Sequence, residues 1–141
     1  AHRGSNRHHR FVRGGVAGVA SALITMPKAA RAGDVIEVRA LVQHAMETGY
    51  RRSSEGALLP RDLIRRFTCS FVEGTGQSVS TSDGSSKPGS RLVFAATLHA
   101  AVAANPYFAF HFRAERSGTL LFIWTGDNGF AHREQVNLLV T

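Results

Sequence analysis

The side chains best suited to chemistry in this chain of 141 residues are a few histidines and a single cysteine. Imidazole and thiolate groups are the protein ligands that transition metals prefer. Outside the N-terminal stretch the set consists of His44, His99, His111, His132 and Cys69. No two of these histidines are close enough in sequence to form a ligand pair, so spacing alone does not gather the five side chains around one point.

Four histidines and one cysteine on a β-sandwich would resemble the iron site of superoxide reductases, and a metal-binding sandwich is therefore one alternative for this chain. The surroundings predicted for Cys69 argue against it. Phe67, Cys69 and Phe71 fall on the same side of a predicted strand. Burial among apolar groups raises the pKa of a thiol. We therefore expect Cys69 to be an inert core residue, and we predict no metal and no other cofactor.

Motifs of common enzyme classes are also missing from the sequence. There is no nucleophile elbow, no glycine-rich phosphate loop, and no pair of Cys or His residues at metal-binding spacing. Glu47 and Glu55 lie in a polar stretch that contains several arginines, which favours surface ion pairs over acid–base catalysis. The sequence predicts a protein without catalytic activity.

The net charge of +7 comes from the N-terminal part of the chain. All 10 acidic residues lie at Asp34 or later, whereas six of the 17 lysines and arginines precede it, so the rest of the chain is nearly neutral. Nucleic-acid binding through the basic tail is a further alternative, but a clustered basic face on the domain is not indicated. No run approaches the roughly 20 apolar residues of a membrane-spanning helix. We expect neither a nucleic-acid nor a membrane partner.

Hydrophobic alternation divides the chain into a basic flexible tail at 1–20 and one domain at 21–141. Strict alternation of apolar and polar residues indicates half-buried strands. About seven such strands with turns between them and no long helix predict an all-β fold, an immunoglobulin-like antiparallel β-sandwich. The predicted strands cover 21–26 (an edge strand ended by Pro27), 34–43, 63–73, 92–98, 107–113, 118–125 and 130–140.

The densest apolar stretch is 93–113, which is broken once, at Asn105-Pro106. After the break three phenylalanines alternate with polar or small residues, which predicts that Phe108, Phe110 and Phe112 face the core. Before the break Leu92, Phe94, Ala96 and Leu98 alternate in the same way and are predicted to share one face.

Strand 118–125 is apolar on both sides, with Leu121 and Ile123 opposite Leu120, Phe122 and Trp124. Such a strand is either central in its sheet or covered by a partner protein. The Gly-Asp-Asn-Gly sequence that follows it predicts a hairpin turn. Two stretches lack a strand pattern: 44–56 is predicted to be a loop, and 74–90, rich in Gly and Ser, a flexible excursion.

Four motifs resemble the SoxZ family, the non-carrier subunits of the SoxYZ complexes of bacterial sulfur oxidation. They are HAMETGYR in the predicted loop, PKAARAGDVIEVRALVQHAMETG around it, PRDLIRRFTCSF, and the long run LHAAVAANPYFAFHFRAERSGTLLFIWTGDNG. The resemblance spans roughly 22–141. Ala45 and Ala100 stand where the family usually has proline, the 74–90 stretch is longer than usual, and the N-terminal tail has no counterpart.

The resemblance implies a heterodimer with SoxY, which holds thiosulfate-derived intermediates on a cysteine in a glycine-rich C-terminal arm while periplasmic Sox enzymes act on them in turn. This chain ends in QVNLLVT, without a Gly-Gly-Cys-Gly arm. It is therefore expected to be the scaffold subunit and not the carrier. Since SoxZ usually lacks its own export signal, a periplasmic location reached together with SoxY is also implied.

The residues expected to shape the partner surface lie in two predicted loops, and structural roles in turns remain an equal alternative for Glu47 and Asn105. The set comprises His44, Met46, Glu47, Thr48, Gly49, Tyr50, Asn105, Pro106 and Tyr107.

Overall fold

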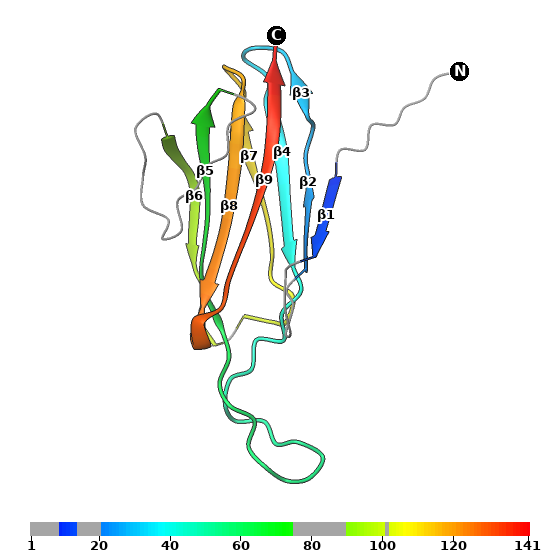
Figure 1. The fold of residues 1–141 in the computed structure, drawn as a ribbon, viewed down its shortest axis with the longest axis vertical. Helices are drawn as coiled ribbons and strands as arrows, with labels where there is room; N and C mark the ends of the chain where they lie inside the picture. The colour runs from blue at the N-terminus through cyan, green and yellow to red at the C-terminus, as the bar shows by residue number, and fades with distance from the viewer. Residues whose placement is uncertain (1–8, 14–20, 75–89, 101) are drawn as a thin grey trace, which may run out of the picture.

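The structure is a computed structural model that describes residues 9–13, 21–74, 90–100 and 102–141. Two β-sheets pack face to face (Figure 1), so the predicted all-β sandwich is confirmed. The four-stranded sheet has the order β1-β2-β4-β7 and the five-stranded sheet the order β3-β9-β8-β5-β6. The strands are β1 His9–Arg13, β2 Ser21–Thr25, β3 Ala29–Ala30, β4 Val35–Val42, β5 Ile64–Glu73, β6 Ser90–Thr97, β7 Tyr107–Arg113, β8 Gly118–Gly126 and β9 Ala131–Val140.

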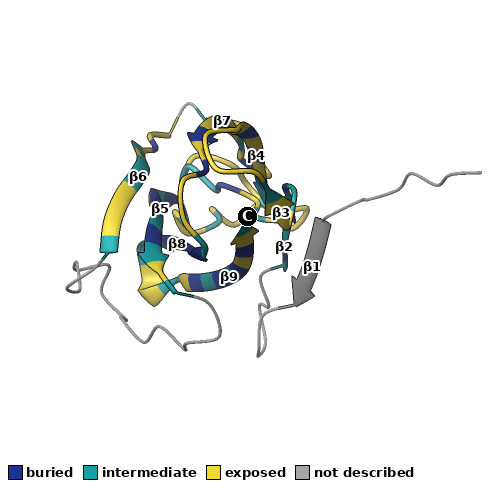
Figure 2. Ribbon diagram, turned by 90° about the horizontal axis from the view of Figure 1, so that it is seen from above, coloured by how far each residue is buried: buried dark blue, intermediate teal, exposed yellow. Residues whose placement is uncertain are grey.

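The alternation seen in the sequence corresponds to burial in the fold. In β4 every second residue from Ile36 to Val42 is buried, and the residues between them are exposed or half-buried. In β7 Phe110 and Phe112 are buried and Phe108 packs against the core, as predicted. Figure 2 shows the same kind of alternation as bands along β9. Side chains of a strand point to opposite faces, so each sheet supplies one apolar face to the interior.

Aromatic rings fill the space between the sheets. Phe67 of β5 stacks on Phe108 of the opposite sheet, with 4.7 Å between ring centroids, and lies 4.9 Å from Trp124 of its own sheet. Phe94 of β6 stacks on Phe110 of β7 at 4.6 Å. Because Phe67 and Phe94 each contact several other rings, the two sheets are held together by many mutually supporting contacts.

Strand β8 lies in the middle of its sheet, paired with β5 on one side and β9 on the other. Its outward side chains Leu121 and Ile123 are only 3% and 6% exposed and contact Val72. Of the two alternatives predicted for this strand, the structure shows the central position. These two residues are already buried within the chain, so they present no open apolar patch.

Two details differ from the sequence prediction. Strand β2 is not an edge strand, because β1 pairs with it along its whole length. Leu92 does not share the face of Phe94, because a β-bulge between Cys69 and Ser70 shifts the register of β5 against β6. Phe94 pairs with Cys69 and Leu92 with Ser70, so Val93 is the extra residue of the bulge and Leu92 falls on the face opposite to Phe94, where it is 53% exposed.

Residues 1–8, 14–20 and 75–89 lie outside the described part of the chain, so flexibility of the tail and of the 74–90 excursion stays a prediction. Within the predicted tail, the structure describes only the backbone of β1. In the described ranges, no helix has the length and apolarity needed to cross a membrane.

Candidate functional site

The predicted site residues gather at one end of the sandwich, which we call the loop end. It consists of the β4–β5 loop (43–63), the β6–β7 connection (98–106 without residue 101) and the β8–β9 turn (126–130). The β4–β5 loop extends well beyond the sheets (Figure 1). Its two limbs pair at Glu47–Asp62 and at Arg52–Leu58, so the loop is a two-limbed projection with its root against the sandwich.

His44 and Asn105 join two of the three segments at this end. The His44 backbone N–H donates to the Asn105 side-chain oxygen at 2.9 Å, and the Asn105 N–H donates to the His44 carbonyl at 2.7 Å. Asn105 has a φ of 55°, a left-handed conformation that asparagine tolerates better than most residues. At the Asn-Pro break of the sequence, two hydrogen bonds therefore join the β6–β7 connection to the β4–β5 loop.

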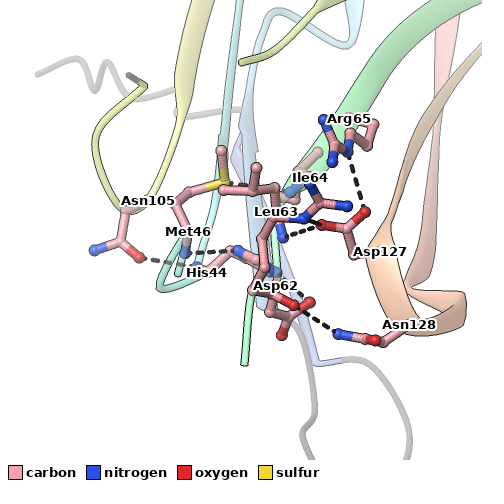
Figure 3. A network of polar contacts seen from close by, with 10 residues as sticks. His44, Met46, Asp62, Leu63, Ile64, Arg65, Asn105, Asp127 and Asn128 are labelled. Carbon is pink, nitrogen blue, oxygen red and sulfur yellow. Dashed lines mark hydrogen bonds and ion pairs between the residues drawn. The ribbon is translucent and has the colours of Figure 1, made fainter. Parts of the chain in front are cut away.

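The His44 imidazole faces inward at the root of the β4–β5 loop, with 7% of the side chain exposed. Its Nδ1 accepts a hydrogen bond from the Met46 N–H at 2.9 Å (Figure 3), which places the proton of the neutral ring on Nε2. The Phe130 ring packs edge-on against it at 4.9 Å. Burial lowers the pKa of His44 below its ordinary value; attraction by Asp62, 3.8 Å away, and by Asp127 acts in the opposite direction but is weaker.

Met46 and Glu47 continue the root of the loop. Met46 is 5% exposed and has a φ of 55°, and its sulfur accepts a hydrogen bond from the Ile64 N–H at 3.3 Å. Glu47 forms a bidentate ion pair with Arg51, and this hydrogen bonding lowers the pKa of the Glu47 carboxyl. The turn role considered for Glu47 in the sequence is supported by its paired backbone with Asp62.

Asp127, in the turn η1 (Asp127–Gly129), connects the third segment to the other two. Its carboxylate accepts hydrogen bonds from the Leu63 N–H at 3.1 Å and from Arg65 at 3.0 Å, and it lies 3.3 Å from Arg61. The hydrogen bond from Arg65 is the main reason that the pKa of Asp127 is lowered. Sequence reasoning missed this residue, although the Gly-Asp-Asn-Gly turn marked its position.

The nine predicted site residues divide into a structural framework and two exposed aromatic side chains. Gly49 belongs to the framework: its φ is 95°, and a Cβ there would approach the Arg61 Cβ to 3.2 Å. Pro106 is buried, whereas Thr48 is half-buried. Tyr50 and Tyr107 are 87% and 54% exposed and are the large apolar groups of the predicted set that face solvent.

Leu58, which the sequence analysis did not select, is 55% exposed on the same projection. It has no sequence signal, because an isolated leucine in a loop gives no hydrophobic period.

The residues considered for metal binding lie in unrelated surroundings. Cys69 is fully buried in β5, and desolvation raises the pKa of its thiol, as expected for an inert core cysteine. His99 and His111 are exposed, and His132 is buried beside Glu134, with 3.2 Å between Nε2 and Oε2. In the ranges that the structure describes, no three His, Cys, Asp or Glu side chains are arranged to hold a metal ion.

An open pocket of about 220 Å³ lies at the opposite end of the sandwich and contains none of the predicted site residues. The Arg91 guanidinium lies over the rings of Phe71 and Phe112, with centroid distances of 5.9 and 5.6 Å. Arg116 beside it pairs with Glu73 at 2.9 Å.

Comparison with known protein families gives a match over most of the chain. The family model described as "Sulphur oxidation protein SoxZ" matches residues 24–88 and 83–137, which is most of the chain. A search of curated proteins gives no match.

Solved structures with a similar fold include superoxide reductases. The superoxide reductase (neelaredoxin) from Ignicoccus hospitalis superposes with a TM-score of 0.60 and 17% sequence identity, over 85% of this chain and 80% of that chain. A putative superoxide reductase from Thermotoga maritima gives a TM-score of 0.53 and 15% identity, over 85% of each chain. At these identities the likeness shows a shared fold and says nothing about activity.

Proposed function

The chain belongs to the SoxZ family of sulfur oxidation proteins, and from this premise we propose that it is the non-catalytic scaffold subunit of a SoxYZ complex. In this role it pairs as a heterodimer with the sulfur-carrier protein SoxY. It helps to present the carrier's cysteine-bound intermediates to the periplasmic Sox enzymes, which it meets transiently, during thiosulfate oxidation.

The observation that carries the proposal is the burial of the only cysteine in the sequence. Cys69 is 0% exposed and sits on the core face of β5. Covalent attachment of a sulfur intermediate needs an accessible thiolate, and burial disfavours both access and ionisation. Because the Cys69 thiol is buried, it is not suited to carry a sulfur intermediate. The carrier cysteine is therefore expected to come from a partner protein.

The loop end supplies a surface suited to such a partner. Tyr50 and Tyr107 are exposed aromatic side chains on a framework in which His44, Met46 and Asn105 are joined by hydrogen bonds. Tyrosines are enriched in protein interfaces, because each buries a large apolar area while its hydroxyl keeps a hydrogen bond. We assign the contacts to Tyr50 and Tyr107 and the supporting roles to the other seven predicted residues.

Co-purification with a SoxY-like carrier tests the proposal. The chain and the carrier should elute together as a heterodimer at micromolar concentration. A carrier whose arm cysteine is replaced by serine is the matched control, and it should bind equally well because the proposed interface does not use the thiol. If neither carrier forms a complex, the proposal is wrong.

We propose a periplasmic location, reached by export together with SoxY. Fractionation of cells that express the chain with and without the carrier tests this. The chain should reach the periplasm only when the carrier is present, and periplasmic protein in cells without the carrier would contradict joint export.

A further inference from the structure

We propose that His44 is a proton-operated latch, which fixes the root of the β4–β5 loop while its ring is neutral and releases the root when the ring takes up a proton. The latch is a property of the chain alone. Its effect on partner binding rests on the proposed function, because that function places the exposed Tyr50 contact on this loop.

The direction of one hydrogen bond makes the latch sensitive to protons. The His44 Nδ1 can accept the Met46 N–H at 2.9 Å only while Nδ1 has no proton of its own. A proton added to the neutral ring goes to this nitrogen, because Nε2 already bears one. Two donors then face each other, and the contact becomes repulsive.

Among the residues that the structure describes, the Nδ1 of His44 is the acceptor recorded for the Met46 N–H. The Met46 side chain is 5% exposed, its backbone is left-handed, and its sulfur already accepts the Ile64 N–H. A buried N–H without an acceptor is unfavourable, so the backbone at this point must rearrange. The next residue, Glu47, forms the pairing with Asp62 that closes the two limbs of the loop, so the rearrangement reaches the projection directly.

Charged groups around the His44 ring influence the pH at which it takes up a proton. Asp62, 3.8 Å from Nε2, and Asp127 both favour the protonated ring. Asp127 is bound to Arg61 and Arg65, and Glu47 is paired with Arg51, so these carboxylates are largely compensated.

The direction of the pH effect follows from the balance between burial and these charges. Burial outweighs the attraction by the carboxylates and lowers the pKa of His44 in the folded chain. The neutral latch is therefore closed above the ordinary histidine value of about 6.5, and stability at the root is lost as the pH falls from there through the lowered value.

Nuclear magnetic resonance of the full chain tests the latch without any partner. As the pH is lowered from about 8 to about 5, the range in which histidines titrate, the His44 ring should titrate below the ordinary histidine value of about 6.5. Exchange of the Met46 amide with solvent, corrected for the intrinsic pH dependence, should rise on the order of tenfold over the same range as its hydrogen bond is lost. The amide of Phe67 in β5 should stay protected.

Variants separate the latch from general acid sensitivity. Asn at position 44 places a non-titrating oxygen near the position of Nδ1, so His44→Asn should make exchange of the Met46 amide independent of pH. The control His111→Asn removes an exposed histidine and should leave the transition unchanged. Asp62→Asn removes the nearest carboxylate and should shift the transition to lower pH, which keeps the test decisive if His44→Asn folds poorly.

Two results would overturn the latch: a Met46 amide equally protected at both pH values, or a transition that Asp62→Asn leaves in place. Failure of the proposed function is a different result. In that case the latch opens in the isolated chain, but affinity for the carrier shows no matching decrease in acid.

Discussion

The core between the sheets and the loop end are held together in different ways. In the core Phe67 stacks on Phe108 and also contacts Trp124, Phe94 and Phe122, so each ring is supported by several others. At the loop end single hydrogen bonds join segments far apart in sequence, such as those between His44 and Asn105 and between Leu63 and Asp127. The core depends on apolar area, whereas the loop end depends on individual donors and acceptors.

This difference explains where the molecule should respond to its surroundings. The contacts between the phenylalanine rings contain no titratable group, so the packing of Phe67 on Phe108 should not itself depend on pH. The loop end contains one histidine, His44, and two carboxylates, Glu47 and Asp127, whose pKa values are shifted by their surroundings. Regulation and recognition are therefore expected at the loop end, and stability in the core.

The largest effect should come from breaking the core. Phe67→Ala removes a fully buried ring and leaves a cavity, which should lower the free energy of unfolding by about 3–5 kcal/mol. Denaturation with urea measures this change. A loss below about 1 kcal/mol would mean that the packing between the sheets is not what stabilises the fold.

A smaller loss should follow from Asn105→Ala at the loop end. Alanine removes the acceptor of the His44 N–H and is strained at a φ of 55°, so we expect a loss of about 2 kcal/mol. Asn105→Gly is the matched variant: it removes the acceptor but tolerates the backbone, and it should lose about 1 kcal/mol. Equal losses in the two variants would show that backbone strain has no part in the effect.

Asp127 should give a pH-dependent effect. Its pKa is lowered in the folded chain, so its contribution is fully present above the ordinary aspartate value and is lost as the pH falls through the lowered one. The destabilisation by Asp127→Asn should therefore be greatest at neutral pH and shrink below about pH 4. Unfolding free energies of both proteins across this range measure the difference, and a constant difference would contradict the role of the ionised carboxylate.

The smallest effect is expected at Leu92, which the bulge turns outward. Leu92→Ser should change the free energy of unfolding by less than about 0.5 kcal/mol, because the side chain is already largely in solvent. Phe94→Ser, two residues on and stacked on Phe110, is the control and should cost far more. A large loss of unfolding free energy in Leu92→Ser would mean that Leu92 packs on the core face.

The fold followed from the sequence because alternation is repeated along whole strands. In β4 the same face is indicated by four apolar residues, so one ambiguous residue does not change the predicted face. These four are Ile36, Val38, Ala40 and Val42. Leu92 was placed on the wrong face because a bulge adds one residue without an apolar signal of its own. The pairing of β1 with β2 was missed because the β1 segment is short and basic and has no clear alternation.

The site was predicted less completely. The motif resemblance identified the loops, but it did not separate the framework residues His44 and Asn105 from the exposed Tyr50 and Tyr107. Asp127 and Asp62 were missed because their partners lie far away in the sequence. A single sequence does not show which distant residues come into contact. Polar contacts of this kind become visible only once the strands have brought the loops together.

The central claim is that the loop end binds the carrier subunit. The most direct test is to measure the affinity of the carrier for two double variants of this chain. One variant carries Tyr50→Ser and Tyr107→Ser, which remove the exposed aromatic groups of the loop end. The other carries Val35→Ser and Leu139→Ser. These two apolar residues lie at the opposite end of the sandwich and are also exposed, by 53% and 54%. We predict that the tyrosine variant binds at least about tenfold more weakly than the wild type, a typical loss for interface aromatics, while the second variant binds normally. Unchanged binding by the tyrosine variant, together with weakened binding by the other, would contradict the account.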